Sequence, residues 1–178
     1  MNTKRFITRP RLPDFDYVGA RAYHVVIATR EREPILVNRV ASRVVGVLAA
    51  TADSTAFELL AFTVMPDHVH ILAVGTSDHS SLRRFTQRFK QVTSYEWIRT
   101  HGKRMWQPSF YDRTLRRDED ARAVARYILE NPVRAQLMRP DERWPFSGGT
   151  MVAEADGGAK STQLRCVASH AATEPVQP

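Results

Sequence analysis

A short hairpin in the middle of the chain constrains the fold most strongly. Two apolar runs, "AFELLAFTV" and "HVHILAV", are separated only by Met65, Pro66 and Asp67. Proline fixes its own φ and lacks a backbone donor, so these three residues predict a turn between two strands. Strands joined by so short a turn pair antiparallel, because a parallel pair needs a long crossover. The sequence therefore predicts a sheet with antiparallel pairing.

The elements around the hairpin complete a mixed order. "AYHVVIATR" predicts a strand, and residues 38–50 carry apolar side chains at helical spacing. Ser80 or Ser81 can cap a long helix that ends at Gly102. "MWQPSFYDRTLR" predicts a loop and a short strand, and a last helix runs from a cap at Asp118 to Pro132. This order predicts an α+β sandwich, with helices on one face of a small antiparallel sheet.

The long helix is apolar on one face and basic on the others. Its apolar stripe is predicted to be core and consists of Leu82, Phe85, Phe89, Val92 and Tyr95. Between Ser80 and Arg104 the chain has seven basic side chains and one acidic one. The whole chain has a net charge of +7 and a pI of about 10.1, which favours a polyanionic partner.

The predicted nucleic-acid contacts follow from this concentration of charge. They are Arg83, Arg84, Arg88, Lys90, Arg104 and Arg113. The alternative for the basic helix is an ordinary solvated face. Trp106 and Phe110 alternate with two of these arginines, and they would either stack on unpaired bases or pack under the loop.

Length and composition predict one globular domain. The 178 residues are 43% hydrophobic and 25% charged. We expect an N-terminal arm over 1–20, a domain over 21–146, and a mobile, glycine-bearing tail over 147–178. The only cysteine is Cys166, which excludes a disulfide within one chain. No run is apolar enough to span a membrane, so we expect a cytoplasmic protein.

The second strand of the hairpin carries His68 and His70, one residue apart. Successive side chains of a strand point to opposite faces, so both imidazoles share one face, and Val69 and Ile71 share the other. Two neutral imidazoles on one face can hold a metal ion. By itself, the pattern favours two ordinary half-buried strand histidines, so the metal hypothesis depends on the rest of the chain.

The last helix adds a phenol and an amide to this pair. Tyr127 and Asn131 are four residues apart and lie one above the other, on a flank of the stripe that would face the sheet. If that helix covers the histidine strand, all four side chains can converge. Such a set suits cleavage of a phosphodiester by the tyrosine, with a metal polarising the phosphate. Its mixed nitrogen and oxygen ligands suit Mg²⁺ or Mn²⁺.

Several motifs resemble one family of DNA-processing enzymes. "MPDHVHIL" resembles the HUH motif (His, bulky hydrophobic, His) of the single-tyrosine transposases of bacterial insertion sequences. "RYILENPVRAQL", "WQPSFYDRTLR" and "WPFS" resemble segments of one branch, the REP-associated tyrosine transposases. The resemblance covers roughly 17–147, in the family's order. One departure is Asp67, which stands where the family commonly has asparagine.

The resemblance implies a fold, an activity and roles for single residues. It implies a ferredoxin-like sheet with helices on one face, His68 and His70 as metal ligands with Asn131 as the third, and Tyr127 as nucleophile. The implied activity is metal-dependent cleavage and strand transfer of single-stranded DNA with palindromic hairpins, through a 5′-phosphotyrosine. A bacterial, nucleoid-associated protein is implied, either monomeric or homodimeric.

Other assignments compete with this hypothesis. Tyr111 is a rival nucleophile, although it has no metal ligand at fixed spacing, and His24 is predicted to be structural rather than catalytic. A second functional class is a module that binds single-stranded nucleic acid without cutting it. A third is an HUH replication initiator or relaxase, which usually belongs to a longer chain. Tyr127 discriminates between these classes, because binding alone does not require a helical tyrosine beside a ligand amide.

Overall fold

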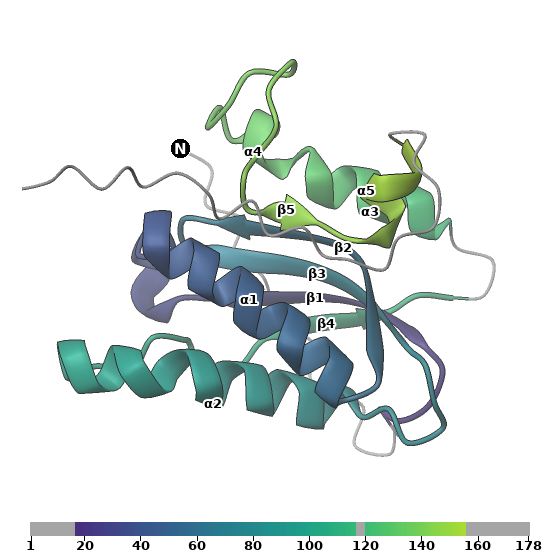
Figure 1. Ribbon diagram of the computed structural model, residues 1–178, viewed down its shortest axis with the longest axis horizontal. Helices are drawn as coiled ribbons and strands as arrows, with labels where there is room; N and C mark the ends of the chain where they lie inside the picture. The colour runs from purple at the N-terminus through teal and green to yellow at the C-terminus, as the bar shows by residue number, and fades with distance from the viewer. Residues whose placement is uncertain (1–16, 117–119, 156–178) are drawn as a thin grey trace, which may run out of the picture.

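Five strands form one antiparallel sheet in the order β4-β1-β3-β2-β5 (Figure 1). The structure is a computed structural model that describes residues 17–116 and 120–155. The strands are β1 (Ala22–Ala28), β2 (Phe57–Met65), β3 (His68–Gly75), β4 (Tyr111–Thr114) and β5 (Ser147–Gly148). The helices are η1 (Arg30–Arg32, a 3-10 turn), α1 (Asn38–Ser54), α2 (Leu82–His101), α3 (Ala121–Leu129), α4 (Asn131–Arg134) and α5 (Thr150–Ala155).

The predicted hairpin is the centre of the sheet. β2 and β3 pair in register from Met65 opposite His68, and the turn is Pro66 and Asp67. β1 lies on the other side of β3, and β4 lies outside β1. The helices α1 and α2 connect these four strands in the order β1-α1-β2-β3-α2-β4. This connectivity confirms the predicted α+β, ferredoxin-like architecture.

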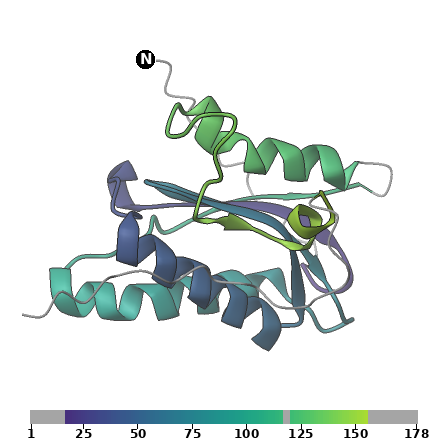
Figure 2. The same cartoon turned by 45° about the horizontal axis from the view of Figure 1, so that its top comes forward.

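One face of the sheet carries the large hydrophobic core. α1 and α2 lie side by side across this face (Figures 1 and 2). Alternate residues of β3, namely Val69, Ile71 and Ala73, point into the core and are fully buried. Leu48 of α1 and Phe85 of α2 pack against this face and are also fully buried. This layer is the predicted sandwich of two helices on a sheet.

A third helix, α3, covers the opposite face, and this corrects the prediction that the helices share one face. Figure 2 shows α3 on the side of the sheet away from α1 and α2. Ala125 and Ile128 of α3 pack on Ala61 and Leu72, which point away from the main core. The stripe that faces the sheet was identified from the sequence, but a stripe does not indicate which of two apolar faces it covers.

The buried stripe of α2 differs from the predicted one in its second half. Val92 and Tyr95 are 38% and 64% exposed, so Tyr95 is not core. The buried positions belong to Thr86 and Thr93, whose hydroxyls donate to the carbonyls of Leu82 and Phe89 one turn earlier. A threonine that satisfies its hydroxyl within the helix can replace an apolar residue in the core. The caps of α2, Ser81 and Gly102, are those predicted.

The domain is longer than predicted at both ends. The 2.9 Å bond from the amide of Gly19 to the Ser80 carbonyl, and a bridge between Val18 and Ser81, hold residues that were predicted to be an arm. At the other end, β5 pairs with β2, although the tail was predicted to start at Ser147. Residues 1–16 and 156–178 of the predicted arm and tail lie outside the described residues.

The glycines after Phe146 permit this close packing and do not mark a tail. Gly149 has a φ of +126°, which other residues rarely adopt, and a Cβ there would collide with the backbone of Leu60. A Cβ at Gly148 would lie 2.8 Å from the Phe62 ring. The predicted start of the tail at Ser147 was therefore wrong. That prediction relied on composition, and the composition of this segment resembles that of a flexible one.

The last helix also begins and ends differently. The Oδ1 atom of Asp120 accepts the amide hydrogen of Arg122 at 2.8 Å and so caps α3. The predicted cap, Asp118, lies outside the described residues. Pro132 does not simply end the helix, because it occupies the first turn of α4, where a missing N–H costs no helical bond. No helix in the described part of the chain is long and apolar enough to cross a membrane.

Candidate active site on the second face of the sheet

The two histidines of β3 lie on the face that α3 covers. Val69 and Ile71 take the core side, so the pleat sends His68 and His70 to the other side, as predicted. Their Nε2 atoms are 3.0 Å apart, and their ring centroids are 4.8 Å apart at 74°. His70 is 2% exposed. The strand therefore holds two imidazole nitrogens that face one another beneath the protein surface.

The ring of His68 is oriented by a carboxylate. Its Nδ1 atom lies 2.5 Å from Oδ1 of Asp67, and the other oxygen of Asp67 lies 3.3 Å from Nε of Arg32. Burial would raise the pKa of Asp67, but the hydrogen bond and charge of His68 and the charge of Arg32 hold that pKa below its usual value. An ionised carboxylate only accepts hydrogen bonds, so Nδ1 of His68 carries the hydrogen.

Arg32 reaches Asp67 from a strained part of the backbone. Glu31 and Arg32 have φ values of +55° and +59°, in the left-handed region that disfavours residues with a side chain. Such strain persists only where the surrounding structure holds the backbone in place, and it is common at functional sites. The Asp67 ion pair is one contact that fixes this turn beside the site.

A third histidine, His24 of β1, joins the pair. Its Nε2 atom lies 3.2 Å from Nδ1 of His70, and the two ring centroids are 5.5 Å apart with their planes 21° from parallel. Burial, with the charge of Arg113 adding to it, lowers the pKa of His24 to about 4. Burial, with the neighbouring charges of His68, His24 and Arg32 adding to it, lowers the pKa of His70 to about 2. Both rings are therefore neutral near pH 7.

α3 places Tyr127 over these rings. The Tyr127 ring centroid lies 6.1 Å from that of His70 and 6.3 Å from that of His24, with the rings nearly perpendicular. Tyr127 is 40% exposed, although its neighbour Ile128 is fully buried. The guanidinium carbon of Arg134 in α4 lies 5.2 Å from the centre of the same ring. The site thus combines a solvent-accessible phenol, the buried imidazole of His70, the half-buried imidazole of His24 and a guanidinium.

Asn131 lies one turn after Tyr127, as predicted, but as the first residue of α4, and its side-chain amide nitrogen bonds to the end of α3. The Nδ2 atom donates to the carbonyls of Tyr127 and Ile128 at 2.7 and 3.3 Å. The amide oxygen makes no hydrogen bond to any residue in 17–116 or 120–155. Asn131 therefore supports the end of α3 and retains an oxygen that can act as a ligand.

The rival nucleophile, Tyr111, lies on β4 at the far side of His24. Their ring centroids are 6.3 Å apart, whereas Tyr127 is close to both His24 and His70. The geometry thus favours Tyr127, which contacts one member of the β3 pair directly.

The predicted nucleic-acid contacts do not lie on one surface. Arg83, Arg84 and Arg88 are exposed on α2, which covers the opposite face of the sheet from Tyr127. Lys90 donates to the carbonyls of Gln107 and Pro108 and so holds the loop before β4. Arg113 pairs across from His24 in the sheet and lies beside the site, and Arg104 is exposed in the loop after α2.

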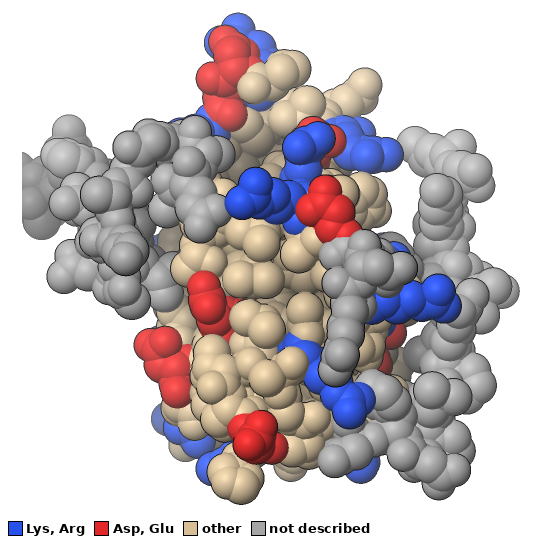
Figure 3. Space-filling view, turned by 90° about the vertical axis from the view of Figure 1, so that its right-hand side faces the viewer, with Lys and Arg blue, Asp and Glu red and all other residues tan. Residues whose placement is uncertain are grey.

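Basic side chains are spread along the face of the molecule seen in Figure 3. Figure 3 shows basic side chains at the end of the molecule where α3 and α4 lie and also at the opposite end.

Trp106 is not available for stacking on bases, because it is 3% exposed and its Nε1 donates to Thr93 at 2.7 Å. The packing alternative is therefore confirmed for Trp106.

The donor set fits a divalent cation. Two nitrogens that each bind an ion at about 2.1 Å, at right angles, are about 3.0 Å apart, which is the separation of the two Nε2 atoms. The described residues contain no cluster of three or more His, Cys, Asp or Glu side chains that would hold a metal by themselves. A cation on the pair would need further oxygen ligands, from Asn131, a phosphate or water.

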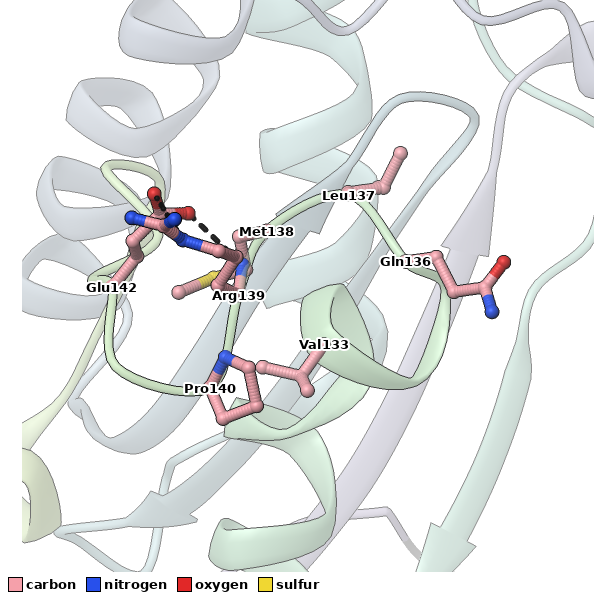
Figure 4. A pocket seen from close by; sticks show the side chains of 7 residues that line it. All are labelled: Val133, Gln136, Leu137, Met138, Arg139, Pro140 and Glu142. Carbon is pink, nitrogen blue, oxygen red and sulfur yellow. Dashed lines mark hydrogen bonds and ion pairs between the residues drawn. The ribbon is translucent and has the colours of Figure 1, made fainter.

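A shallow depression lies elsewhere, in the loop after α4 (Figure 4). Its lining contains none of the predicted site residues and consists of Val133, Gln136, Leu137, Met138, Arg139, Pro140 and Glu142. Arg139 and Glu142 form an ion pair at 3.3 Å within it. This depression is therefore separate from the candidate site around Tyr127.

Comparison with known proteins identifies the family of the chain. The sequence profile of the family described as "Transposase IS200 like" matches residues 17–131, a segment that contains the hairpin, Tyr127 and Asn131. The chain belongs to the IS200-like transposase family. The match ends before β5, so the last strand of the sheet lies outside the region that defines the family.

Two relatives of this chain illustrate the range of the family. A REP-associated tyrosine transposase of Escherichia coli (strain K12) is 35% identical over 94 residues, 51% of this chain and 53% of the relative. The matched segment thus spans about half of the relative's length. The ISDra2 transposase TnpA of Deinococcus radiodurans is 28% identical over 126 residues, 65% of this chain and 86% of the relative.

A solved structure shares the fold. The REP-associated tyrosine transposase bound to a REP hairpin superposes with a TM-score of 0.65 and 21% identity, covering 91% of this chain and 96% of that one. At this identity, the likeness concerns the fold. It covers more of the chain than the family profile matches, so the shared architecture extends beyond the region that defines the family.

Sequence reasoning missed two contributors to the site. His24 was predicted to be structural, yet its ring contacts His70 and Tyr127. Arg134 was quoted only within a motif, and it lies over the Tyr127 ring. For His24 a signal existed, because Tyr23, Val25 and Ile27 are the apolar positions of its strand, which leaves His24 on the face of the histidine pair.

Proposed function

We propose that this protein is a DNA-cleaving and strand-transferring enzyme whose nucleophile is Tyr127. The observation that carries the proposal is the placement of an exposed phenol over the buried ring of His70, whose Nε2 atom faces that of His68. Its substrate would be single-stranded DNA that contains palindromic hairpins, which agrees with the hairpin complex of the structural relative. Such an enzyme would act on the nucleoid, in the bacterial cytoplasm.

His68, His70 and the amide oxygen of Asn131 would hold the cation, Mg²⁺ or Mn²⁺. When bound, this ion withdraws charge from a non-bridging phosphate oxygen and makes the phosphorus a better electrophile. The residues around the pair prepare it: Asp67 orients His68, and burial keeps His70 neutral, so that its lone pair is available to a ligand.

The proposed reaction exchanges one phosphate ester for another. The Oη atom of Tyr127 attacks phosphorus and loses its proton to water, because it makes no hydrogen bond to a base in the described part of the chain. The bond from phosphorus to the 3′ oxygen breaks, and that oxygen takes up a proton. The products are a 5′-phosphotyrosine and a free 3′ hydroxyl. Attack of a 3′ hydroxyl on the phosphotyrosine reverses these steps and joins strands.

Basic residues would position the DNA from two sides. Arg134 lies over the Tyr127 ring and Arg113 lies across from His24, so both can meet the phosphate that reacts. The exposed arginines of α2 lie on the opposite face of the sheet, so they would hold a distant part of the hairpin. The proposed DNA contacts are therefore Arg134 and the six residues predicted from the sequence, namely Arg83, Arg84, Arg88, Lys90, Arg104 and Arg113.

The test is the substitution Tyr127→Phe, with Tyr111→Phe as the matched control. The change removes one oxygen and keeps the ring that contacts His70 and His24. We expect Tyr127→Phe to bind a hairpin oligonucleotide as wild type does, but to form no covalent adduct and no cut product with Mn²⁺. Tyr111→Phe should retain both. Gel electrophoresis of labelled DNA under denaturing conditions measures adduct and product together.

Peptide mapping of the wild-type adduct locates the bond independently. The DNA should remain on the peptide that contains "YILENPVR". A wild-type protein that binds hairpins without any adduct would support the non-cleaving alternative. An adduct on Tyr111 would overturn the assignment of the nucleophile.

A further inference from the structure

The histidine pair lies within a longer chain of hydrogen-bonded groups, and the inference from this chain rests on the proposed cation site. The contacts run from Arg32 to Asp67, to His68, to His70 and to His24. Their lengths are 3.3, 2.5, 3.0 and 3.2 Å in that order. Each imidazole of the pair therefore has its second nitrogen occupied by another side chain.

On one side the hydrogen position is fixed. The carboxylate of Asp67 can only accept, so Nδ1 of His68 carries a hydrogen, and Nε2 has a lone pair available toward His70. Metal-binding histidines usually donate their other N–H to such a partner, which sets both the tautomer and the ring orientation. Asp67 is therefore already arranged to make His68 a ligand.

On the other side the position of the hydrogen can change. Without a cation, two nitrogens 3.0 Å apart share one hydrogen, and His70 can supply it from Nε2 to His68 while its Nδ1 accepts from His24. A cation between the two Nε2 atoms requires both lone pairs. His70 must then carry its hydrogen on Nδ1, which faces Nε2 of His24.

We propose that His24 is a positioning residue for the cation site: its Nε2 accepts the Nδ1 hydrogen of His70 and so keeps the lone pair of His70 on Nε2, toward His68. His24 does for His70 what Asp67 does for His68. His24 belongs to β1, whereas Asp67 belongs to the turn between β2 and β3. The hairpin alone therefore does not complete the site.

The location of His24 suits this role. In the sheet, Val26 pairs with His70 and His24 pairs with Leu72, so His24 reaches His70 diagonally on the same face. Its ring is held in place by the edge contact with Tyr127 and by the hydrogen bond to His70. Since β1 is an inner strand that pairs on both sides, its position is set by the sheet.

The test measures Mn²⁺ affinity by the electron paramagnetic resonance signal of the free ion, with no DNA present. The variants are His24→Phe, which keeps a ring and has no acceptor, and His24→Gln, whose amide oxygen can accept the same hydrogen. We expect His24→Phe to weaken Mn²⁺ binding by about tenfold to a hundredfold, the usual effect of removing such a support. His24→Gln should recover most of this loss.

The outcomes separate this role from the proposed function. Equal affinity in wild type and His24→Phe, or an equal loss in both variants, would overturn the positioning role while leaving the cation site intact. His68→Ala serves as the reference, because it removes a ligand. If wild type and His68→Ala bound Mn²⁺ equally, the cation site itself would be wrong, and the role of His24 with it.

A second measurement needs no variant and therefore does not depend on whether His24→Phe folds. Nitrogen-15 spectra of the histidine rings in wild type report which ring nitrogen carries the hydrogen. With saturating Mg²⁺, we expect His70 to be protonated on Nδ1 and bare on Nε2. A hydrogen that remained on Nε2 of His70 under these conditions would overturn the proposal.

Discussion

The two faces of the sheet are built from the same strands and have different contents. The face under α1 and α2 is a continuous apolar core that includes Phe85, Phe89 and Trp106. On the face under α3, the buried apolar cluster is small, Ala61, Leu72, Ala125 and Ile128, and it borders the three histidines. In β3, successive residues alternate between these two environments.

This difference separates stability from chemistry. Burial of apolar surface stabilises the fold in proportion to its area, so most of that stabilisation comes from the α1 and α2 face. The second face contributes less to this stabilisation, and it contains imidazoles and an exposed phenol. Buried polar groups lower the stability of the fold where they lack hydrogen-bond partners. Substitution of one residue of β3 should thus affect mainly activity, and substitution of the next residue should affect mainly stability.

The largest expected effects come from a matched pair in β3, His70→Ala and Ile71→Ala. His70→Ala removes a proposed cation ligand and should reduce cleavage at least about a hundredfold, with little change in the free energy of unfolding. Ile71 is fully buried on the core side, and its truncation should lower that free energy by about 2–5 kcal/mol. Folded Ile71→Ala should still cleave. Urea unfolding and single-turnover cleavage measure the two effects.

The pair tests the separation directly. If Ile71→Ala lost cleavage to the same extent as His70→Ala while remaining folded, the core face would also shape the site. Wild-type cleavage by His70→Ala would remove the histidine pair from the mechanism.

Acid should destabilise the protein through the second face. His24 and His70 have pKa values of about 4 and about 2 when folded, against 6.5 when unfolded. Between pH 6.5 and 4 the unfolded chain therefore binds more protons than the folded one, and stability falls as pH falls. Each group contributes at most about 1.4 kcal/mol per pH unit in that window. Chemical unfolding at several pH values measures the slope.

A double variant, His24→Gln with His70→Gln, is the control for this slope. It should unfold with a flatter pH dependence above pH 4, because neither position titrates. The buried polar residues of the described chain include no histidine besides His70 and no carboxylate, so the core face should add little. An unchanged slope would place the acid sensitivity elsewhere.

Much of the fold was predictable because its signals are local. The Pro66 turn set the hairpin, the pleat set the common face of His68 and His70, and four-residue spacing aligned Tyr127 with Asn131. These relations need only the geometry of one strand or one helix. The contact between Tyr127 and His70 followed from a resemblance to a family, since spacing alone does not place a helix on a strand.

What the sequence did not predict depends on tertiary context. His24 joins the site through the register of β1 against β3, which no local pattern specifies. Tyr95 matched an apolar stripe, yet Thr93 is buried in its place. Gly148 and Gly149 have the composition of a linker and serve a close approach to β2. In each case the deciding partner is far away in the sequence.

Arginines on the two faces should affect different steps. Replacing Arg83, Arg84 and Arg88 by alanine should weaken hairpin binding and flatten its salt dependence, by up to about 0.7 in slope for each phosphate that an arginine had neutralised. The cleavage rate at saturating protein should stay close to wild type, because α2 lies on the face opposite Tyr127. Arg134→Ala should instead slow cleavage at saturating protein and change the salt dependence of binding only slightly.

Titrations of the hairpin DNA with protein at several salt concentrations measure the effect on binding, and single-turnover cleavage rates measure the effect on catalysis. An unchanged salt slope in the triple variant would mean that the α2 arginines form a solvated face. A slower saturated rate in the triple variant would mean that DNA held by α2 also sets the geometry at Tyr127.

The smallest expected effect concerns local unfolding of the helices that cover the two faces of the sheet. Asp120 caps α3 with a 2.8 Å bond and Ser81 caps α2 with a 3.4 Å bond, and loss of either cap costs about 0.5–2 kcal/mol. α3 has nine residues, too few to be stable without packing, and little apolar surface holds it. Asp120→Ala should therefore speed hydrogen exchange of α3 amides alone, with a modest loss of cleavage because Tyr127 lies in that helix. α2 is part of the main core, so Ser81→Ala should lower the protection of core amides in β1 and β3 together with those of α2. If Asp120→Ala lowered protection equally in α3 and the core strands, the two faces would unfold as one unit, and the separation of stability from chemistry would not extend to the dynamics of the chain.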